Sequence, residues 1–330
     1  MTVSNKSVFI SRDLPSIGMK LLEDAGFKVT SWHHDRPMMQ EELIIEAKKV
    51  DALFCTSADK IDAHFLESCA HLEIISQYAA GYDNVDLVAA NAMGIPIGNT
   101  PGAMSESTAD IAFGLMIAVS RWMFYMHKSI IEGKWDYFRP KANLGMELTG
   151  KTLGVFGLGQ IGMEMAKRCK GAYDMRIIYC NRNQNISADR TLGAERVDFE
   201  TLLKHSDVVS VHSILSDETK GIFNKSAFDQ MKRTAIFINT SRGGVHNEAD
   251  LIQALESGAI WGAGLDVTNP EPMHPDNPLL QMERVAILPH LGSATIEARD
   301  RMATMAAQNI ISFYKTGTIP HLVNPSALSG

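Results

Sequence analysis

Apolar runs and amphipathic stretches alternate along the first third of the chain. Runs suited to buried strands cover 8–10, 27–29, 52–55 and 72–76, and apolar residues recur at helical spacing over 15–25, 40–49 and 63–68. Strands and helices that alternate at this interval form right-handed β-α-β units around a parallel sheet. This part of the chain is therefore predicted to form one α/β domain.

A second series of the same kind begins beyond Gly150. Its six apolar runs cover 152–156, 176–179, 208–212, 235–238, 262–265 and 285–288. Six parallel strands of this kind predict a doubly wound sheet. Between the two series, an acidic, alanine-rich run predicts a long apolar helix from Glu106 through Val119. No further strand follows the helical stretch 295–316, and we expect this last helix to return to the first domain.

Length, composition and charge fit a folded protein with two cores. The chain has 330 residues, 45% of them hydrophobic, and single cores tend to split beyond about 250 to 300 residues. A net charge of -7 argues against nucleic acid as a partner, because such binding needs many Lys and Arg contacts to phosphate. No window approaches a membrane-spanning length of apolar residues, and no signal-peptide pattern is present. We therefore expect a cytoplasmic protein that does not bind a membrane.

The cysteines and histidines form no recognisable metal pattern. The four cysteines include no C-x-x-C pair, so reduced thiols are expected. The run His33-His34-Asp35 lies in a polar stretch with no third ligand at a recognisable spacing. The sequence therefore predicts no metal site.

The sharpest local signal is a glycine-rich run. The motif G-x-G-x-x-G spans 157–162, between the strand-like 153–156 and the helix-like 163–170. Its first glycine permits a tight turn, its second lets the backbone approach a pyrophosphate, and its third lets helix and strand pack closely. This context predicts a dinucleotide site, with a glycine-rich turn that binds nothing as the alternative. The residues predicted to contact the dinucleotide here are Gly157, Gly159, Gln160, Ile161 and Gly162.

The end of the next strand bears on the choice of cofactor. Enzymes that use NAD carry an Asp or Glu about 20 residues beyond the fingerprint, where it binds the ribose hydroxyls. Here Asn181 lies 19 residues after Gly162, and Arg182 follows it. Asn181 does not repel a 2′-phosphate, and Arg182 offers it a bidentate cationic fork, so we expect a preference for NADP(H). The alternative is that Arg182 is a solvated surface residue and that NAD(H) is used as well.

Polar residues follow the later apolar runs. Each of Arg242, Asp266, Glu271 and His290 comes shortly after one of these runs. Ligands of open α/β sheets bind at the carboxyl ends of the strands, so the four side chains are steered towards one crevice. Any one of them alone is more often structural or solvated. Their joint position behind a dinucleotide fingerprint predicts a catalytic site.

Motifs along nearly the whole chain carry a resemblance to a known family. They are Gly81-Tyr-Asp-Asn-Val-Asp86, Asn99-Thr-Pro-Gly102, the glycine fingerprint, Thr240-Ser-Arg-Gly-Gly244, Gly264-Leu-Asp-Val267, Glu271-Pro272, Pro289-His-Leu-Gly-Ser-Ala294 and Val323-Asn-Pro325. The chain resembles the D-isomer-specific 2-hydroxyacid dehydrogenases, and within them the glyoxylate/hydroxypyruvate and 2-ketogluconate reductases. The resemblance implies two Rossmann-like parallel-sheet domains. A doubly wound dinucleotide-binding domain over 103–294 would be inserted in a flavodoxin-like substrate domain over 1–102 and 295–330.

The resemblance implies that Arg242, Glu271 and His290 are the catalytic residues, and their chemistry suggests the same roles. His290 would deliver a proton to the carbonyl oxygen of a small 2-keto acid, giving a D-2-hydroxy acid. Glu271 would orient the imidazole and raise its pKa. Arg242 would bind the substrate carboxylate and polarise the carbonyl. The family pattern adds the backbone N–H groups of Ala80 and Gly81 as a grip on that carboxylate.

The resemblance implies further contacts to the cofactor. Asp266 is matched to the nicotinamide carboxamide, and Gly292 and Ser293 are matched to the reactive end of the cofactor. The other residues expected at the cofactor are Thr108, Ser213, Ile214, Thr219, Thr240 and Ser241. The chain departs from the family pattern at 213–215, where Pro-Leu-Thr is usual, and at 245–248, where Val-Asp-Glu is usual. His246, in the second of these stretches, is expected to be a neutral surface residue.

The sequence leaves two alternative functions open and suggests a homodimer. A phosphite-type dehydrogenase and a non-catalytic nucleotide-sensing protein of corepressor type share the scaffold. Glu271 argues against a formate enzyme, and the absence of long flanking segments argues against a corepressor. The aromatic and Met-rich stretch 121–135 resembles the family's dimerisation arm, so a homodimer is expected, with ordinary core packing as the alternative. We expect an NADPH-preferring reductase that acts on glyoxylate, hydroxypyruvate or 2-ketogluconate.

Overall fold

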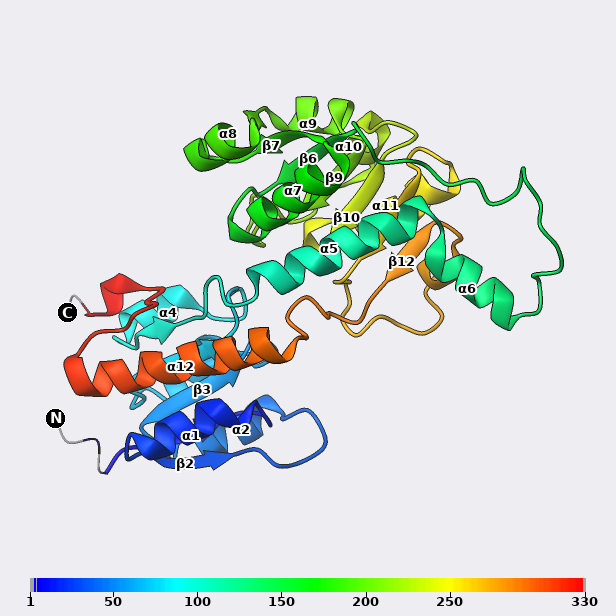
Figure 1. The fold of residues 1–330 in the computed structure, drawn as a ribbon. Helices are drawn as coiled ribbons and strands as arrows, with labels where there is room; N and C mark the ends of the chain where they lie inside the picture. Colours follow the sequence, from blue (N-terminus) through cyan, green and yellow to red (C-terminus); the bar gives the residue numbers. More distant parts are fainter. Residues whose placement is uncertain (1–2, 4, 329–330) are drawn as a thin grey trace. The chain divides into compact units, whose positions relative to one another are not determined.

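Residue 3 and residues 5–328 are described by a computed structural model, in which the chain divides into two compact units (Figure 1). The first unit joins Met1–Met104 to Ala294–Gly330, and the second is Ser105–Ser293. Each unit contains one parallel sheet. The predicted α/β class with two Rossmann-like sheets is confirmed.

The first unit is built on a five-stranded sheet with the order β2-β1-β3-β4-β5. Its strands are β1 (Ser7–Ile10), β2 (Lys28–Ser31), β3 (Ala52–Thr56), β4 (Ile74–Tyr78) and β5 (Ile97–Gly98). Its helices are α1 (Ser16–Asp24), α2 (Gln40–Ala47), α3 (Ala63–Ser68), α4 (Leu87–Ala92), α12 (Ile296–Thr316) and the 3-10 helix η3 (Pro325–Leu328). This order is that of flavodoxin-like sheets. Every residue of β3 is buried, because helices cover both faces of a parallel sheet.

The last helix, α12, packs in the core of the first unit. Ser76 Oγ in β4 donates to Ala306 O at 2.8 Å, and a Cβ on Gly18 in α1 would lie 3.1 Å from Ala303 O. The helix begins after Thr295, whose side chain accepts from Ala298 N, and ends at Gly317 in the left-handed conformation. Capping and close packing together place this distant segment against the first sheet.

The second unit contains a seven-stranded sheet with the order β12-β11-β10-β9-β6-β7-β8, which is doubly wound. Its strands are β6 (Thr152–Phe156), β7 (Arg176–Cys180), β8 (Glu195–Arg196), β9 (Val208–Val211), β10 (Ile236–Asn239), β11 (Gly262–Leu265) and β12 (Val285–Ile287). Its helices are α5 (Ser105–Ser120), α6 (Met123–Ile131), α7 (Gln160–Tyr173), α8 (Ile186–Leu192), α9 (Phe199–His205), α10 (Lys225–Gln230) and α11 (Glu248–Glu256), with 3-10 helices η1 (Gly243–Val245) and η2 (Pro278–Gln281). The prediction of six strands is wrong by one. The additional strand, β8, has two exposed polar residues at the sheet edge and so has no apolar signature.

The apolar helix α5 is a core element of the second unit. Leu115, Met116 and Val119 are buried in it, and a Cβ on Gly264 of β11 would lie 2.9 Å from Leu115 Cβ. Among the described residues no single helix has both the length and the apolar character of a membrane span. The helices α5 and α6 meet that test only together, as a pair bent by 64°.

Candidate active site

The glycine-rich loop joins β6 to α7 at the carboxyl edge of the second sheet. Gly157 has a φ of +94°, and a Cβ there would lie 2.6 Å from Ser213 N. Gly159 N–H donates to Gly157 O at 2.8 Å and closes the turn. A Cβ on Gly162 would lie 2.8 Å from Gly157 O. The chain's own backbone therefore excludes side chains at the first and third glycines.

The second glycine of the motif is different. No atom lies within 4 Å of the position that a Cβ on Gly159 would take, so the surrounding protein does not require glycine there. Gly159 is the N-cap of α7, which has 14 residues. The first N–H groups of a helix have no intrahelical acceptor and carry partial positive charge. The loop, with Gln160 exposed and Ile161 half-buried, therefore fits a pyrophosphate.

Asn181, at the end of β7, holds this loop in place. Its Oδ1 accepts from Leu158 N at 2.6 Å, and its Nδ2 donates to Leu158 O at 3.2 Å. Asn185 Nδ2 donates to the same carbonyl oxygen at 3.0 Å. A carboxylate at 181 could not donate to Leu158 O. The amide therefore has a structural role that sequence reasoning missed, and its effect on a 2′-phosphate stays a prediction.

Two arginines lie beside the end of β7. The side chain of Arg182 is 79% exposed, and its Nη1 is 3.9 Å from Glu218 Oε2. Arg196 in β8 donates through Nε to Asn181 O at 3.1 Å and through Nη2 to Arg182 O at 2.6 Å. Arg196 was missed because β8 itself was missed. Together these residues place two cations at the end of β7, where Glu218 faces Arg182 and the charge of Asp198 acts on Cys180.

His290 and Glu271 form a close ion pair. His290 Nδ1 donates to Glu271 Oε1 at 2.5 Å, and both side chains remain 42% exposed. This hydrogen bond is the main cause of a raised pKa for His290; burial opposes it, and the charges of Glu271 and Asp266 add to it. Burial raises the pKa of Glu271, but the hydrogen bond and charge of His290 outweigh burial, so the net pKa is lowered. Both shifts favour a charged imidazolium-carboxylate pair.

Asp266 anchors the segment that carries His290. The residue is 1% exposed, and its Oδ1 and Oδ2 accept from Leu291 N at 2.7 Å and from Gly292 N at 2.8 Å. Thr108 Oγ1, on α5, donates to Gly292 O at 3.1 Å. Burial raises the pKa of Asp266, although the two N–H groups oppose the shift. Asp266 and Thr108 thus hold this segment from two sides, and their contacts to a nicotinamide stay predictions.

Asn239, at the end of β10, organises the loop that carries Arg242. Its Nδ2 donates to Arg242 O at 2.9 Å and to His246 Nδ1 at 3.0 Å. Its Oδ1 accepts from the N–H and the hydroxyl of Ser241, each at 2.9 Å. All hydrogen-bonding positions of this buried amide are therefore used within one short loop. No sequence motif singled out Asn239.

Arg242 acts electrostatically on the His290–Glu271 pair. A Cβ on Gly243 would lie 1.9 Å from Thr268 O, so the Arg242 loop touches the segment before Glu271. The positive charge of Arg242 contributes to lowering the pKa of both His290 and Glu271. The three predicted catalytic residues, which lie far apart in sequence, thus meet within the second unit.

His246 is buried, and the prediction of a surface position is wrong. It is 2% exposed and forms a parallel bridge with Phe223, which draws it into the unit. Burial lowers its pKa to about 4, so the ring is neutral as expected. The neighbouring Asn247 caps α11 by accepting from Asp250 N at 3.1 Å. Asn and Asp cap helices about equally well, so the departure from the family pattern at Asn247 leaves α11 capped.

A second histidine at this edge was also missed. His212 follows β9, and its ring nitrogens are hydrogen-bonded to Ser210 Oγ at 2.8 Å and to Thr240 Oγ1 at 3.3 Å. The backbone N–H of His212 donates to Phe156 O at 2.8 Å, so His212 joins the ends of β6, β9 and β10. Burial lowers its pKa to about 3. The ring is therefore a neutral support beneath the glycine loop.

The remaining predicted cofactor residues lie in two places. Thr219 Oγ1 donates to Ile214 O at 2.7 Å and closes the loop that begins at Ser213, whose Oγ is buried without a partner. Ile214 is 54% exposed, as a residue that contacts a ligand rather than the core would be. Ser293 is half-buried at the end of the His290 segment.

Ala80 and Gly81 belong to the first unit, after β4. Asn99 Nδ2 donates to Ala80 O at 2.8 Å, and Gln77 Nε2 donates to Gly81 O at 2.5 Å. Side chains therefore bind both carbonyl oxygens. Neither N–H group makes a hydrogen bond within the described part of the chain. A pair of free N–H groups suits an anion.

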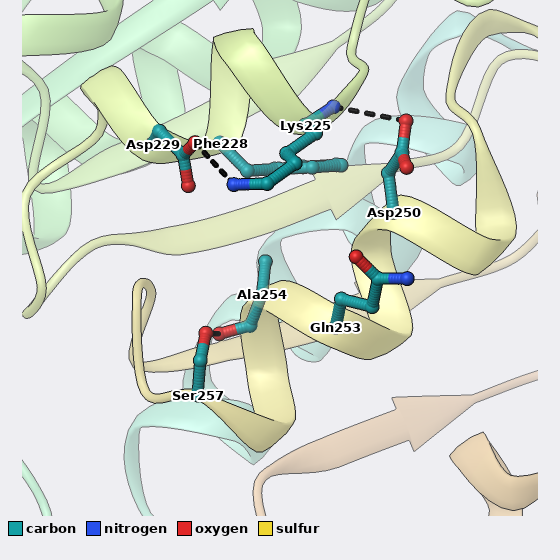
Figure 2. A pocket seen from close by; sticks show the side chains of 7 residues that line it. All are labelled: Lys225, Phe228, Asp229, Asp250, Gln253, Ala254 and Ser257. Atoms are coloured by element: carbon teal, nitrogen blue, oxygen red, sulfur yellow. Dashed lines mark hydrogen bonds and ion pairs between the residues drawn. The ribbon is translucent and has the colours of Figure 1, made fainter.

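The hollow shown in Figure 2 is a different feature, of about 180 Å³, between α10 and α11. Lys225 Nζ donates to Asp229 at 2.6 Å, and the backbone N–H of Lys225 donates to Asp250 at 2.9 Å, so both carboxylates that line the hollow accept from Lys225. None of the predicted site residues lines it. In residue 3 and residues 5–328, no three metal-ligating side chains lie together.

Comparisons with known proteins agree with this geometry. Residues 113–292 match the family model described as D-isomer specific 2-hydroxyacid dehydrogenase, NAD binding domain. A glyoxylate reductase of Korarchaeum cryptofilum is 42% identical to the chain over 96% of this chain and 95% of its own length. A glyoxylate reductase of Thermococcus litoralis is also 42% identical, over 98% of each chain. A solved glyoxylate reductase from Paecilomyes thermophila is 31% identical with a TM-score of 0.87, over 97% of this chain and 98% of its own. An NADPH-dependent glyoxylate/hydroxypyruvate reductase of Sinorhizobium meliloti has been solved with NADP and malonate. It is 26% identical with a TM-score of 0.84, and the match covers 98% of this chain and 97% of its own.

Proposed function

Because the chain belongs to the D-isomer-specific 2-hydroxyacid dehydrogenase family, we propose that it reduces small 2-keto acids to D-2-hydroxy acids with NADPH as the preferred cofactor. The observation that carries this proposal is the His290–Glu271 pair at 2.5 Å, with Arg242 acting on both partners. Glyoxylate and hydroxypyruvate are the first expected substrates, and 2-ketogluconate is a larger third. The test is the loss of NADPH absorbance with each acid; no turnover with any of them would contradict the proposal.

The second unit is proposed to hold the nicotinamide dinucleotide, which supplies a hydride when bound. The loop 157–162 would bind the pyrophosphate with its N–H groups. Arg182 would bind the 2′-phosphate of the adenosine ribose, and the anchored segment 290–293 would lie at the nicotinamide end. Buried Asp266 holds the segment 290–293 through two backbone N–H groups, and buried His212 binds Ser210 and Thr240 at the neighbouring strand ends.

The proposed roles of the catalytic residues follow from their charges. His290, held through Nδ1, would donate the proton on Nε2 to the carbonyl oxygen as the carbonyl carbon is reduced. Glu271 remains ionised and stabilises the imidazolium before the transfer. Arg242 would bind the carboxylate and stabilise negative charge on the carbonyl oxygen. Ala80 and Gly81 would bind the same carboxylate through their N–H groups.

Replacing Glu271 with Gln is expected to shift the pH profile of glyoxylate reduction. Reduction needs protonated His290, so kcat/KM is lost as pH rises through the pKa of His290. Glu271 raises that pKa, and a neutral amide would not, so the alkaline limb should move to lower pH in Glu271→Gln. The measurement is kcat/KM against pH at saturating NADPH. Glu256→Gln, at the exposed end of α11, is the matched control, and an unmoved limb in Glu271→Gln would exclude this role.

The cofactor preference is tested by two substitutions at the end of β7. Arg182→Gln removes an exposed cation, and its kcat/KM for NADPH should fall about tenfold while that for NADH changes little. Asn181→Asp should also turn the NADPH/NADH ratio towards NADH, because a carboxylate repels the phosphate. It should in addition weaken both cofactors, since Leu158 O loses a donor. An unchanged ratio in both variants would place the phosphate elsewhere.

A homodimer is proposed through the segment that begins with α6. None of the residues of α6 is buried, and Trp135 and Phe138 are 74% and 83% exposed. So much exposed apolar surface on one segment is typical of an interface. Light scattering should give twice the mass of one chain, and a monomer at micromolar concentration would contradict the proposal. A cytoplasmic location stays a prediction.

A further inference from the structure

The carboxyl edge of the first sheet carries a polar cluster that the proposed reaction does not use. Asp59 is 4% exposed, and its Oδ2 accepts from Ser11 Oγ at 2.5 Å, Thr56 N at 2.7 Å and Thr56 Oγ1 at 2.9 Å. Arg12 lies beside it, with Nε donating to Thr56 Oγ1 at 3.3 Å. Buried oxygen atoms thus hold a permanent cation just past the end of β1.

This cluster is continuous with the segment proposed to bind the substrate carboxylate. Thr56 O accepts from Asn84 Nδ2 at 3.3 Å, and Asn84 Oδ1 accepts from Gln77 Nε2 at 2.9 Å. Gln77 Nε2 also donates to Gly81 O at 2.5 Å. The bonds run from Arg12 across β3 to the end of β4. Adjacent strands are about 4.8 Å apart, so these two ends are separated by roughly 10 Å, a gap that the long Arg12 side chain partly covers.

The guanidinium of Arg12 is not used up by its contacts within the chain. Its Nη2 is 3.7 Å from Asp59 Oδ1, which is too far for a hydrogen bond, and its side chain is 29% exposed. Of its five N–H donors, the one on Nε has an acceptor within the described residues. Gln77 Oε1, in the same network, is buried without a partner. If Arg12 served only to neutralise Asp59, its remaining N–H donors would not need to lie without acceptors at the carboxyl edge of the sheet, where ligands bind.

We propose that Arg12 recognises the end of the substrate remote from its 2-keto carboxylate. It would select 2-keto acids that carry an oxygen-bearing group a few atoms away, a carboxylate more strongly than a hydroxyl, because a guanidinium fork binds a carboxylate through two hydrogen bonds. An apolar 2-keto acid of the same size would displace water from the guanidinium but would offer no acceptor for the hydrogen bonds that the water had accepted. Glyoxylate has no remote group and does not reach it. This inference rests on the proposed function, which places the carboxylate at Ala80 and Gly81.

The test uses pairs of substrates that match in size and differ in the remote group. Oxaloacetate is compared with 4-methyl-2-oxopentanoate, in which an isopropyl group replaces the second carboxylate. Hydroxypyruvate is compared with 2-oxobutanoate, in which a methyl group replaces the hydroxyl. The readout is the ratio of kcat/KM within each pair at saturating NADPH, so a general loss of activity cancels.

The native protein should favour the oxygen-bearing member of each pair, and by more for the carboxylate than for the hydroxyl. In Arg12→Gln the carboxylate ratio should fall about 10- to 100-fold, as expected when a charged hydrogen bond is lost. Arg12→Lys, which keeps the charge without the fork, should be intermediate. Lys49→Gln removes an exposed cation after α2, at the opposite edge of the sheet, and should keep the native ratios.

A folding defect in Arg12→Gln is distinguished by the double variant Arg12→Gln with Asp59→Asn. This variant removes the buried carboxylate together with its countercharge and should show the same loss of ratio. Equal ratios in the native protein and in either variant would overturn the inference while glyoxylate is still reduced. Failure of the native protein to reduce any of glyoxylate, hydroxypyruvate and 2-ketogluconate would instead contradict the proposed function.

Discussion

His290→Gln is expected to lower kcat for glyoxylate reduction by about 10²- to 10⁴-fold, the range supplied by a well-placed general acid. Gln is similar in reach to His and can still hydrogen-bond to Glu271, but it has no proton to give near neutral pH. The glycine loop and the end of β7 do not include His290, so the binding of NADPH should be retained. The measurement is kcat under saturating conditions, together with a fluorescence titration of NADPH.

The control for this experiment is His205→Gln, a matched change at the exposed C-terminal end of α9. It should leave both kcat and NADPH binding unchanged. Turnover by His290→Gln at the native rate would exclude the histidine as the acid. Loss of NADPH binding together with activity would instead indicate that the whole 290–293 segment has moved, since Asp266 anchors it through Leu291 N and Gly292 N.

The second large effect is expected for Arg242→Gln, which should lower kcat/KM for glyoxylate by about 10²- to 10³-fold. The reason is the loss of a cation that would bind the carboxylate in the ground state and the developing negative charge in the transition state. We therefore expect KM to rise and kcat to fall. The backbone of the loop should survive, because Asn239 binds Arg242 through its carbonyl oxygen rather than through its side chain.

The matched control for Arg242 is Arg233→Gln. Arg233 is exposed and donates to Gly258 O at 3.3 Å, so removal of its charge should not change either kinetic constant. Arg242→Lys should recover part of the activity, since it restores the charge without the planar fork. A native kcat/KM in Arg242→Gln would show that the substrate carboxylate is bound entirely by other groups.

The apolar runs predicted several buried strands of the second sheet closely, whereas the run 72–76 is displaced by two residues from β4 and the buried two-residue strand β5 of the first sheet was not predicted. The runs at 152–156 and 262–265 coincide with β6 and β11, and 208–212 extends one residue beyond β9. These strands are covered on both faces and consist mostly of apolar residues, so the run is visible in the sequence, although β9 also contains the buried Ser210. The strand β8 was missed because its two residues lie exposed at the sheet edge.

The candidate site could be predicted only in part, for a related reason. Arg242, Glu271 and His290 could be expected to lie near one another because each follows a predicted strand, and parallel strands end at one edge of a sheet. Their catalytic roles, which the family resemblance implies, stay predictions. The residues that support them gave no signal. Asn239 and His212 each lie at the end of an apolar run, and nothing local shows that one binds the Arg242 loop and the other Thr240.

The amino-acid sequence by itself determined the α/β class and the glycine-rich turn, because these depend on periodicity and short-range spacing. Only the tertiary structure decided which side chains bind one another across those spacings. It buried His246, bound Asn181 to Leu158 and joined Arg12 to the segment around Gly81. Such contacts depend on the packing of strands that are distant in sequence, and a burial pattern along the chain does not show which neighbour a polar atom meets.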